Sequence, residues 1–415
     1  MHKFEKHDYR ALAAKYGSPF YLYDMEEAAL HVERLKKGLP EGVNLLYCMK
    51  ANANRKVLEA FRGKVWGIDI SSGGELELAL EAGHDAGKMS FAGPGKTDAE
   101  LKRSIETGVH LVSVESPSEL RRLHAFAKVA KKKVSIAIRI NPLSTAKAFA
   151  MRMGGLPSQF GIAEEDVEPV MKEALSYREH LTLEGIHVFS GTNCLEVDAI
   201  VDNIRQTLGI AKRLSETFDH PFSIVNLGGG FGIPYFPGQE SMDTSVLSDS
   251  VGRALREFRA MEPRFAKTEF ILELGRYMIG MFGIYVASVV DVKETRGKRF
   301  AVLDGGMNHC FPPTGNFGQL VKKNYPLKNL SRLGDTALVA QEIVGPLCTP
   351  MDSLGRALEL PKCEPGDLVG FLNSGAYSYS ASPLLFLGHH TPVELVYDGK
   401  EYAIGRSRHA AGEFS

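Results

Sequence analysis

The sequence lacks a long hydrophobic run, an excess of one charge and a regular cysteine pattern. No stretch comes near the roughly 18 consecutive apolar residues of a membrane-spanning helix, and residues 1–15 mix charges without the apolar centre of an export signal. We therefore expect neither membrane insertion nor export. The 49 basic and 50 acidic side chains give a formal net charge of -1, which argues against nucleic acid or an anionic membrane as the main partner.

The five cysteines are odd in number and far apart: Cys48, Cys194, Cys310, Cys348 and Cys363. They match neither a disulfide framework nor the paired spacing of a metal site, so we expect a cytoplasmic protein without a bound metal. The chain also lacks internal repeats, low-complexity tracts and a flexible linker. The remaining class is a globular protein that acts on small molecules.

What the sequence does contain is a regular alternation. Between residues 45 and 276, short apolar or β-branched runs alternate with longer stretches of helical period, which is typical of an α/β protein with a parallel sheet. The eight runs are residues 45–50, 67–71, 89–93, 111–115, 134–141, 185–191, 224–230 and 270–276. The helical stretches are 55–61, 75–82, 99–107, 117–130, 165–175, 199–218 and 248–261. This pattern predicts a (β/α)8 barrel, with a doubly wound open sheet as the alternative.

After residue 276 the sequence changes to short β-rich runs broken by glycine and proline, which indicate a second, mainly β domain. These runs are residues 285–292, 299–303, 337–344, 367–371 and 393–397. A chain of 415 residues also exceeds the size at which one hydrophobic core stops growing. We expect two closely packed domains, a barrel of residues 25–276 and a β-rich domain of residues 277–415. Residues 1–24 are expected to form part of the β-rich domain.

Charged residues and glycines close the eight runs. In a barrel, the C-terminal ends of the strands meet at one mouth, where catalysis takes place in such folds. Lys50 ends the first run, where a lysine can be desolvated, lose its proton and attack an aldehyde, although alone it would be an ordinary surface lysine. The other residues that close runs are Asp69, Glu115, Arg139, His187, Gly228 to Gly230, Glu273 and Arg276.

Three of these features together indicate a phosphorylated ring as the ligand. The glycines at 228–230 can close their N–H groups on an anion such as phosphate, although a tight left-handed turn is the alternative. Arg276 carries donors that suit a phosphate, although it could simply pair with Glu273. A carboxylate such as Glu273 beside a pyridine nitrogen keeps that nitrogen protonated and electron-withdrawing. With Lys50, these residues describe a site for pyridoxal 5'-phosphate.

The chain resembles the fold-type III pyridoxal-phosphate-dependent decarboxylases, which include diaminopimelate and ornithine decarboxylases and, more distantly, alanine racemase. Alanine racemase has arginine at the pyridine nitrogen, so Glu273 favours decarboxylation over racemisation. The matching motifs occur in family order at residues 47–52, 69–76, 139–142, 185–187, 226–232, 273–276, 304–307, 345–348 and 373–377.

The resemblance implies a role for each site residue and a homodimer with shared active sites. Lys50 would bond covalently to the cofactor, Glu273 would face its pyridine nitrogen, and Cys348 would reprotonate the product carbon in a partner subunit's site. Taken singly, His187 could equally be a buried structural histidine, and Cys348 an inert core thiol. The phosphate would be held by Thr192, Gly229, Gly230, Arg276 and Tyr377. The other cofactor-binding residues would be Asp69, Arg139, His187, Phe189 and Gly275.

Departures from the family motifs concern the substrate and the stacking position. Phe189 replaces a second histidine that stacks on the cofactor. Pro312 and its neighbours lack the arginine that grips a distal carboxylate in diaminopimelate decarboxylases, and Thr349 replaces the acid that recognises a distal ammonium. Because a buried charge without a partner is costly, these changes disfavour diaminopimelate, ornithine and lysine as substrates.

The same stretches resemble a narrower branch, which includes exosortase-associated decarboxylases and a decarboxylase of glutamate tethered to an acyl carrier protein. We expect an α-decarboxylase of antibiotic or siderophore biosynthesis that acts on a carrier-tethered or conjugated amino acid. The residues expected near the substrate are Asn316, Thr349, Asp352 and Tyr377. A racemase or diaminopimelate decarboxylase with an altered pocket stays open, as does a non-catalytic cofactor-binding regulator, although retention of both Lys50 and Cys348 argues against the regulator.

Overall fold

The computed structural model describes residues 4–144, 148–315 and 322–414. Eight of its described strands are parallel and run in sequence around one sheet, β2-β3-β4-β5-β6-β9-β11-β12, in which β12 pairs back to β2. Their bounds are β2 (Val43–Cys48), β3 (Gly67–Ile70), β4 (Met89–Phe91), β5 (Leu111–Val114), β6 (Val134–Asn141), β9 (Leu181–Val188), β11 (Ile224–Gly229) and β12 (Glu269–Leu274). This closure confirms the (β/α)8 barrel and rules out the open sheet.

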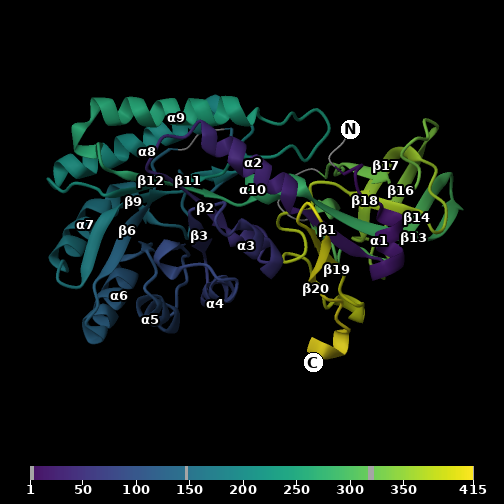
Figure 1. Ribbon diagram of the computed structural model, residues 1–415, viewed down its shortest axis with the longest axis horizontal. Helices are drawn as coiled ribbons and strands as arrows, with labels where there is room; N and C mark the ends of the chain where they lie inside the picture. Colours follow the sequence, from purple (N-terminus) through teal and green to yellow (C-terminus); the bar gives the residue numbers. More distant parts are fainter. Residues whose placement is uncertain (1–3, 145–147, 316–321, 415) are drawn as a thin grey trace. The chain divides into compact units, whose positions relative to one another are not determined.

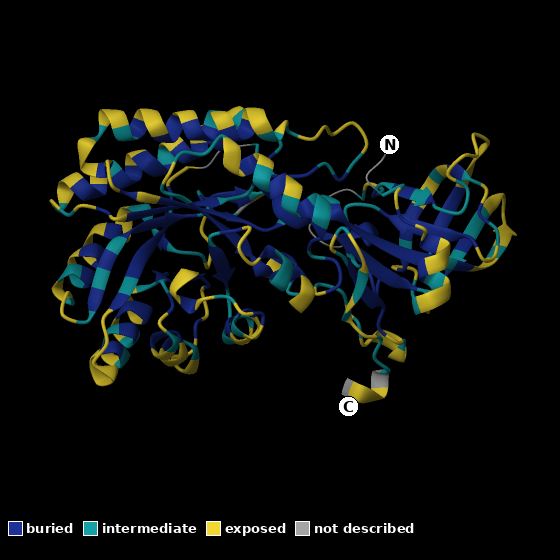
Figure 2. Ribbon diagram, viewed as in Figure 1, coloured by how far each residue is buried: buried dark blue, intermediate teal, exposed yellow. Residues whose placement is uncertain are grey.

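Helices cover the outside of the barrel (Figure 1). Those between the strands are α3 (Arg55–Phe61), α4 (Gly73–Glu81), α5 (Asp98–Thr107), α6 (Pro117–Ala130), α7 (Val167–Ser176), α8 (Val197–Thr217) and α9 (Thr244–Met261). Local signals set their ends: Thr97 and Glu100 form a capping box at the start of α5, and Gly108 ends it at φ +75°. Figure 2 shows their buried inner and exposed outer faces, as the amphipathic periodicity predicts.

Shorter elements complete this part of the chain. α2 (Met25–Lys37) precedes β2, and α10 (Arg276–Ile279) follows β12. The small strands are β7 (Met151–Arg152), which pairs with β10 (Gly191–Thr192), and β8 (Ile162–Ala163), which pairs with β6. The 3-10 helices of the chain are η1 (Met49–Ala51), η2 (Ala86–Lys88), η3 (Glu164–Asp166), η4 (Pro263–Phe265), η5 (Gly280–Phe282), η6 (Pro312–Thr314), η7 (Phe386–Gly388) and η8 (Ala411–Phe414).

The barrel strands are buried on both faces, which explains why their sequences read as apolar runs rather than as alternating patterns. Every residue of β3, β4 and β5 is buried. One interior cluster joins side chains from five strands, against which Trp66 packs; it consists of Leu46, Leu111, Ala137, Ile224 and Ile271. The polar residues inside this apolar wall are therefore the exceptions that need an explanation.

A second, mainly β sheet has the order β17-β16-β14-β13-β1-β19-β20, with β18 between β13 and β15. Its strands are β1 (Phe20–Asp24), β13 (Gly283–Thr295), β14 (Lys298–Leu303), β15 (Leu327–Asn329), β16 (Leu338–Val344), β17 (Ser353–Pro361), β18 (Leu368–Phe371), β19 (Val393–Tyr397) and β20 (Tyr402–Arg406). The N-terminal β1 lies between β13 and β19, and α1 (Tyr9–Tyr16) packs on the same core through Tyr9 and Leu12. This sheet confirms the mainly β C-terminal part.

By its internal contacts the chain forms two compact units. One contains residues 29–233 and 240–278, and the other contains residues 1–28, 234–239 and 279–415. The division into domains after residue 276 stays a prediction about independently folding parts. Within the described residues, no helix is both long and apolar enough to cross a membrane.

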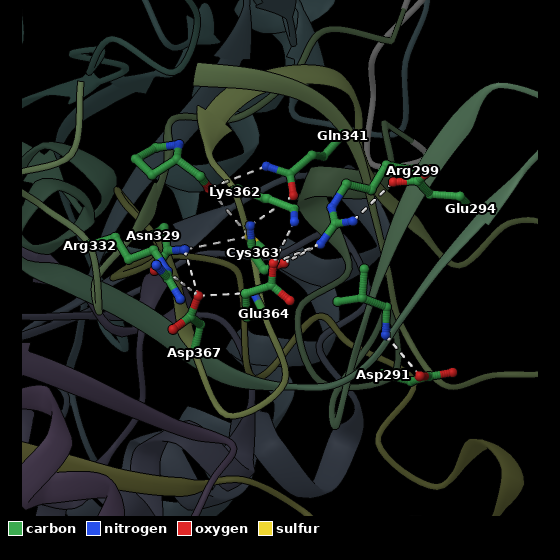
Figure 3. Close-up of polar contacts among 12 residues, drawn as sticks. Asp291, Glu294, Arg299, Asn329, Arg332, Gln341, Lys362, Cys363, Glu364 and Asp367 are labelled. Carbon is green, nitrogen blue, oxygen red and sulfur yellow. Dashed lines mark hydrogen bonds and ion pairs between the residues drawn. The ribbon is translucent and has the colours of Figure 1, made fainter. Parts of the chain in front are cut away.

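A buried polar network holds the turn between β17 and β18 (Figure 3). Asp367 Oδ2 accepts hydrogen bonds from Arg332 Nε (2.7 Å), Asn329 Nδ2 (3.1 Å) and the backbone N–H of Glu364 (3.0 Å). Cys363 is fixed in the same turn because its N–H donates to Gln341 Oε1 at 2.9 Å. The network therefore ties the segment after β17 to Asn329 of β15 and Gln341 of β16.

Candidate active site

Lys50 lies at the mouth of the barrel, but outside the strand. β2 ends at Cys48, and Lys50 sits in η1, where its side chain is 39% exposed. Its Nζ pairs with Oδ2 of the fully buried Asp69 at 3.1 Å, and Asp69 lies beside Cys48 in the β2–β3 pairing. The structure corrects the expectation that Lys50 closes the strand, because β2 ends two residues earlier, at Cys48. The desolvation of its amine stays a prediction.

Glu273 is held from three directions inside the barrel. Its Oε1 accepts hydrogen bonds from Asn226 Nδ2 (2.5 Å) and Ser90 Oγ (3.3 Å), and its Oε2 faces His187 Nε2 at 3.4 Å. Burial would raise the pKa of the Glu273 carboxyl, but His187, Lys50 and the Asn226 hydrogen bond outweigh burial and lower it. Glu273 is thus a fixed, ionised carboxylate.

The two buried carboxylates of the mouth differ in charge behaviour. The pKa of Asp69 is raised by burial and by the Glu273 charge, and the Lys50 charge only partly offsets this. The pKa of Glu273 moves the other way. Two neighbouring acids with pKa values shifted in opposite directions are typical of active sites, where one group stays ionised and the other can hold a proton.

His187 is buried, and both of its ring nitrogens face polar groups. Ser113 Oγ lies 3.0 Å from its Nδ1, and Glu273 faces its Nε2. The His187 ring therefore orients Glu273. Phe189, two residues on, is half-buried and lies against the glycine turn, since a Cβ on Gly228 would come within 3.0 Å of its ring.

The glycine turn follows β11 and needs residues without side chains. Gly228 and Gly230 have φ of +62° and +85°. A Cβ on Gly229 would lie 2.0 Å from the carbonyl oxygen of Glu273, and one on Gly230 would lie 2.2 Å from that of Gly191. The turn thus lies against β12 on one side and the Gly191–Thr192 strand on the other, which brings Thr192 beside the glycines.

Arg139 is fixed by an ion pair rather than left free for a ligand charge. Its Nη1 lies 2.7 Å from Glu115 Oε1, which also accepts the N–H of Gly93 at 2.6 Å. Behind it, the buried Lys96 pairs with Glu119 at 2.9 Å and donates to the carbonyl of Gly93. This network joins the ends of β4, β5 and β6, so Arg139 forms part of a rigid wall.

Gly275 and Arg276 follow the last barrel strand. A Cβ on Gly275 would meet Ala51 Cβ at 2.9 Å and the Cys48 carbonyl at 3.1 Å, so glycine is needed where β12 passes the turn that carries Lys50. Arg276 begins α10 immediately afterwards and is half-buried. Their predicted contacts with a cofactor stay predictions.

The remaining predicted site residues belong to the other unit. Cys348 is exposed, in a short turn that Asp352 supports by accepting the N–H groups of Met307 (2.6 Å) and Leu347 (2.9 Å). Thr349 is half-buried in the same turn. The side chain of Asp352 is thus engaged in holding the turn, and its predicted substrate contact stays a prediction.

Tyr377 is half-buried and has a φ of +56°, a conformation that bulky residues adopt at a cost and that often marks functional sites. Asn316, the fourth residue expected near the substrate, lies outside the described residues.

Sequence reasoning missed several polar residues that hold the site. Ser90, Ser113 and Asn226 orient Glu273 and His187. Ser190 is 3% exposed, its Oγ finds no hydrogen-bond partner among the described residues, and it directly precedes Gly191. The available signal was a lone polar residue inside a short apolar strand, as in Met89-Ser90-Phe91. Most buried polar side chains are hydrogen-bonded, so such a residue indicates a partner on a neighbouring strand.

The described residues fit pyridoxal phosphate. An amine lies at the mouth, an ionised carboxylate is fixed inside it, and a turn that a Cβ would fill lies beside a buried hydroxyl without a partner. These are the groups that bind an aldehyde, a pyridine nitrogen and a phosphate, respectively.

Comparison with known proteins also identifies pyridoxal phosphate as the cofactor. The profile described as "Pyridoxal-dependent decarboxylase, pyridoxal binding domain" matches residues 26–280. The L-glutamyl-[BtrI acyl-carrier protein] decarboxylase of Niallia circulans is 36% identical over 406 residues, covering 97% of this chain and 94% of the relative. The 2-[(L-alanin-3-ylcarbamoyl)methyl]-2-hydroxybutanedioate decarboxylase of Staphylococcus aureus is 32% identical over 390 residues, covering 91% and 93%.

Among solved structures, diaminopimelate decarboxylase from Helicobacter pylori complexed with L-lysine superposes with a TM-score of 0.86 at 25% identity, covering 98% of both chains. The M. jannaschii diaminopimelate decarboxylase gives a TM-score of 0.88 at 26% identity, covering 98% of this chain and 93% of that one. With the family profile and the relatives in agreement, the chain belongs to the pyridoxal-phosphate-dependent decarboxylases of fold type III.

Proposed function

We propose that this decarboxylase removes the α-carboxylate of an amino acid whose distal end is tethered to an acyl carrier protein or conjugated to another acyl group. The observation that carries the proposal is the absence of charge at the two distal positions. Pro312 is buried in η6, and Thr349 has a neutral side chain. A free diamino acid would have to bury a distal charge without these partners, which would cost several kcal/mol, on the order of 2–5.

Two relatives, at 36% and 32% identity, support this substrate class. One is named for a carrier-bound glutamyl group and the other for an alanin-3-ylcarbamoyl conjugate. Diaminopimelate decarboxylases are also relatives, at about 27–31% identity. A neutral linkage at the distal end of the amino acid is compatible with Pro312 and Thr349.

The proposed mechanism assigns each group one task. Bound pyridoxal phosphate supplies an electron-withdrawing ring that accepts the electron pair released when carbon dioxide departs. Lys50 would hold the cofactor through Nζ, and Asp69 would orient that nitrogen. Glu273 would keep a proton on the ring nitrogen, a task suited to a carboxylate that stays ionised. Ser190, Thr192 and the glycine turn would bind the phosphate.

Cys348 would return a proton to the product carbon from a second copy of the chain, so we infer an obligate homodimer with shared sites. The exposed thiol is compatible with that task, since a donor to a partner's site must protrude from its own subunit. Asp352 would hold the turn that carries the thiol in place, through the hydrogen bonds that it accepts from the N–H groups of Met307 and Leu347.

The test is carbon dioxide release in the presence of pyridoxal phosphate. Substrates are free glutamate, free diaminopimelate and other diamino acids, and glutamate loaded on an acyl carrier protein. We expect release from the loaded carrier and little from free amino acids. Efficient release from free diaminopimelate would instead assign the chain to primary metabolism, and racemisation without carbon dioxide would contradict decarboxylation. Cofactor binding without turnover of any substrate would favour the regulator.

A further inference from the structure

Asn226 is completely buried in the middle of β11 (Ile224–Gly229), and its side chain makes two contacts with different parts of the site. Its Nδ2 donates to Glu273 Oε1 at 2.5 Å, and its Oδ1 accepts the N–H of Gly228 at 3.0 Å. One amide therefore bridges the carboxylate inside the barrel and the first glycine of the turn.

The orientation of this amide is fixed by chemistry. A carboxylate only accepts, so the NH2 group must point to Glu273, and a backbone N–H only donates, so the carbonyl must point to Gly228. Asparagine is the residue of this length with one acceptor and one donor at its tip. Aspartate would keep the acceptor toward Gly228 but would set a second carboxylate against Glu273, and alanine would lose both contacts.

The backbone reinforces the link. Gly229 lies opposite Glu273 in the pairing of β11 with β12, close enough that a Cβ would clash with the Glu273 carbonyl. Gly228 has a left-handed φ of +62°. Its N–H donates to the side-chain carbonyl of Asn226, which is the hydrogen bond of an Asx turn. A shift of the glycine turn would therefore be transmitted to the Asn226 side chain and on to Glu273.

We propose that Asn226 is a positioning residue that couples the phosphate-binding turn to the carboxylate facing the ring nitrogen, so that occupation of the turn by an anion fixes Glu273. The proposal rests on the cofactor site proposed above. It predicts that loss of Asn226 weakens anion binding at the turn and also changes the ionisation of Glu273.

Ser90 provides the matched control. Its hydroxyl donates to the same Oε1 of Glu273 at 3.3 Å, but it lies on β4, whereas the glycine turn follows β11. Ser90→Ala should therefore disturb Glu273 and leave the turn intact. The titratable groups that face Glu273 are unchanged in both variants; they are His187 on β9, Asp69 on β3, Cys48 on β2 and Lys50 in η1.

Two quantities would be measured for the wild type, Asn226→Ala and Ser90→Ala. The first is the Kd of the cofactor-free protein for inorganic phosphate, by calorimetry, and the second is the pH at which the absorbance of bound cofactor titrates. We expect Asn226→Ala to weaken phosphate binding by about 10-fold and to shift the titration, because the variant loses the hydrogen bond that closes the turn and the one that Glu273 accepts. Ser90→Ala should shift the titration alone.

An Asn226→Ala protein with wild-type phosphate affinity and only a shifted titration would overturn the coupling. If Asn226→Ala does not fold, Asn226→Asp keeps the Gly228 contact and should raise the titration pH by about one unit or more, because two carboxylates would share one site; no shift would overturn the proposal. Failure of the wild type to bind pyridoxal phosphate would instead refute the proposed cofactor site, so the two failures are distinguishable.

Discussion

Glu273 carries its charge inside a wall of apolar side chains because Asn226 and Ser90 donate hydrogen bonds to it and His187 faces it. Glu273→Gln keeps the shape and removes the charge. We expect the variant to bind cofactor but to lose about 10²-fold or more in kcat, roughly 3 kcal/mol, because a neutral amide cannot hold a proton on the ring nitrogen. Cofactor content and carbon dioxide release check this.

Glu269 offers a control on the same strand. It lies at the opposite end of β12, is exposed, and accepts a hydrogen bond from Asn44 Nδ2 at 2.8 Å. Glu269→Gln should leave kcat unchanged. Unchanged turnover in Glu273→Gln would show that catalysis does not depend on the charge of Glu273.

The glycine turn makes a second residue-scale prediction. Gly229→Ala places a Cβ 2.0 Å from a backbone carbonyl that cannot move aside, so we expect a loss of at least about 2 kcal/mol in the free energy of unfolding of the cofactor-free protein. Gly209, exposed in the interior of α8, meets nothing within 4 Å. Gly209→Ala should stabilise by about 0.5–1 kcal/mol. Urea unfolding measures both, and a Gly229→Ala protein as stable as the wild type would contradict the close packing.

At the scale of elements, the eight barrel strands could be predicted because parallel strands buried on both faces read as apolar runs between helices. β1 and β17 were missed: β1 lies far in sequence from the strands that it pairs with, β13 and β19, and Ser353–Pro361 contains a glycine and two charged residues. The candidate site could be predicted from the ends of the strands, because charged residues and glycines there interrupt the apolar runs. Ser90, Ser113 and Asn226 could not be assigned from sequence, because their partners lie on strands far away in the chain.

The turn between β17 and β18 depends on Asp367. Burial would raise its pKa, but Arg332, the N–H of Glu364 and Asn329 outweigh burial and lower it. A carboxyl whose pKa is lower in the folded state stabilises the fold above its unfolded pKa of about 4, and this stability is lost as the pH falls through the folded pKa. Asp367→Asn should therefore cost about 1–3 kcal/mol at neutral pH, and the difference from wild type should narrow below about pH 4.

Asp335 provides the comparison for this network. It also pairs with Arg332, but at 3.8 Å and with 55% of its side chain exposed. Asp335→Asn should change the free energy of unfolding by less than about 0.5 kcal/mol at any pH. Equal effects of the two variants would show that the buried network does not hold the turn.

At the scale of the whole molecule, the proposed shared site can be tested by mixing inactive chains. Lys50 belongs to the barrel unit and Cys348 to the other unit. If each site combines the barrel of one subunit with the thiol of its partner, a hybrid of Lys50→Ala with Cys348→Ala contains one intact site. Equal mixing makes half of the dimers hybrid, each with one of two sites intact, so the mixture should regain about one quarter of wild-type activity.

The control mixes Lys50→Ala with Glu273→Gln. Both residues belong to the same barrel unit, so no hybrid of these two chains contains an intact site and activity should stay at the level of the parents. Native mass spectrometry would establish that hybrids form in both mixtures. Hybrid dimers of the first mixture without recovered activity would show that Cys348 does not serve the partner's site, and an active monomer would refute the shared site altogether.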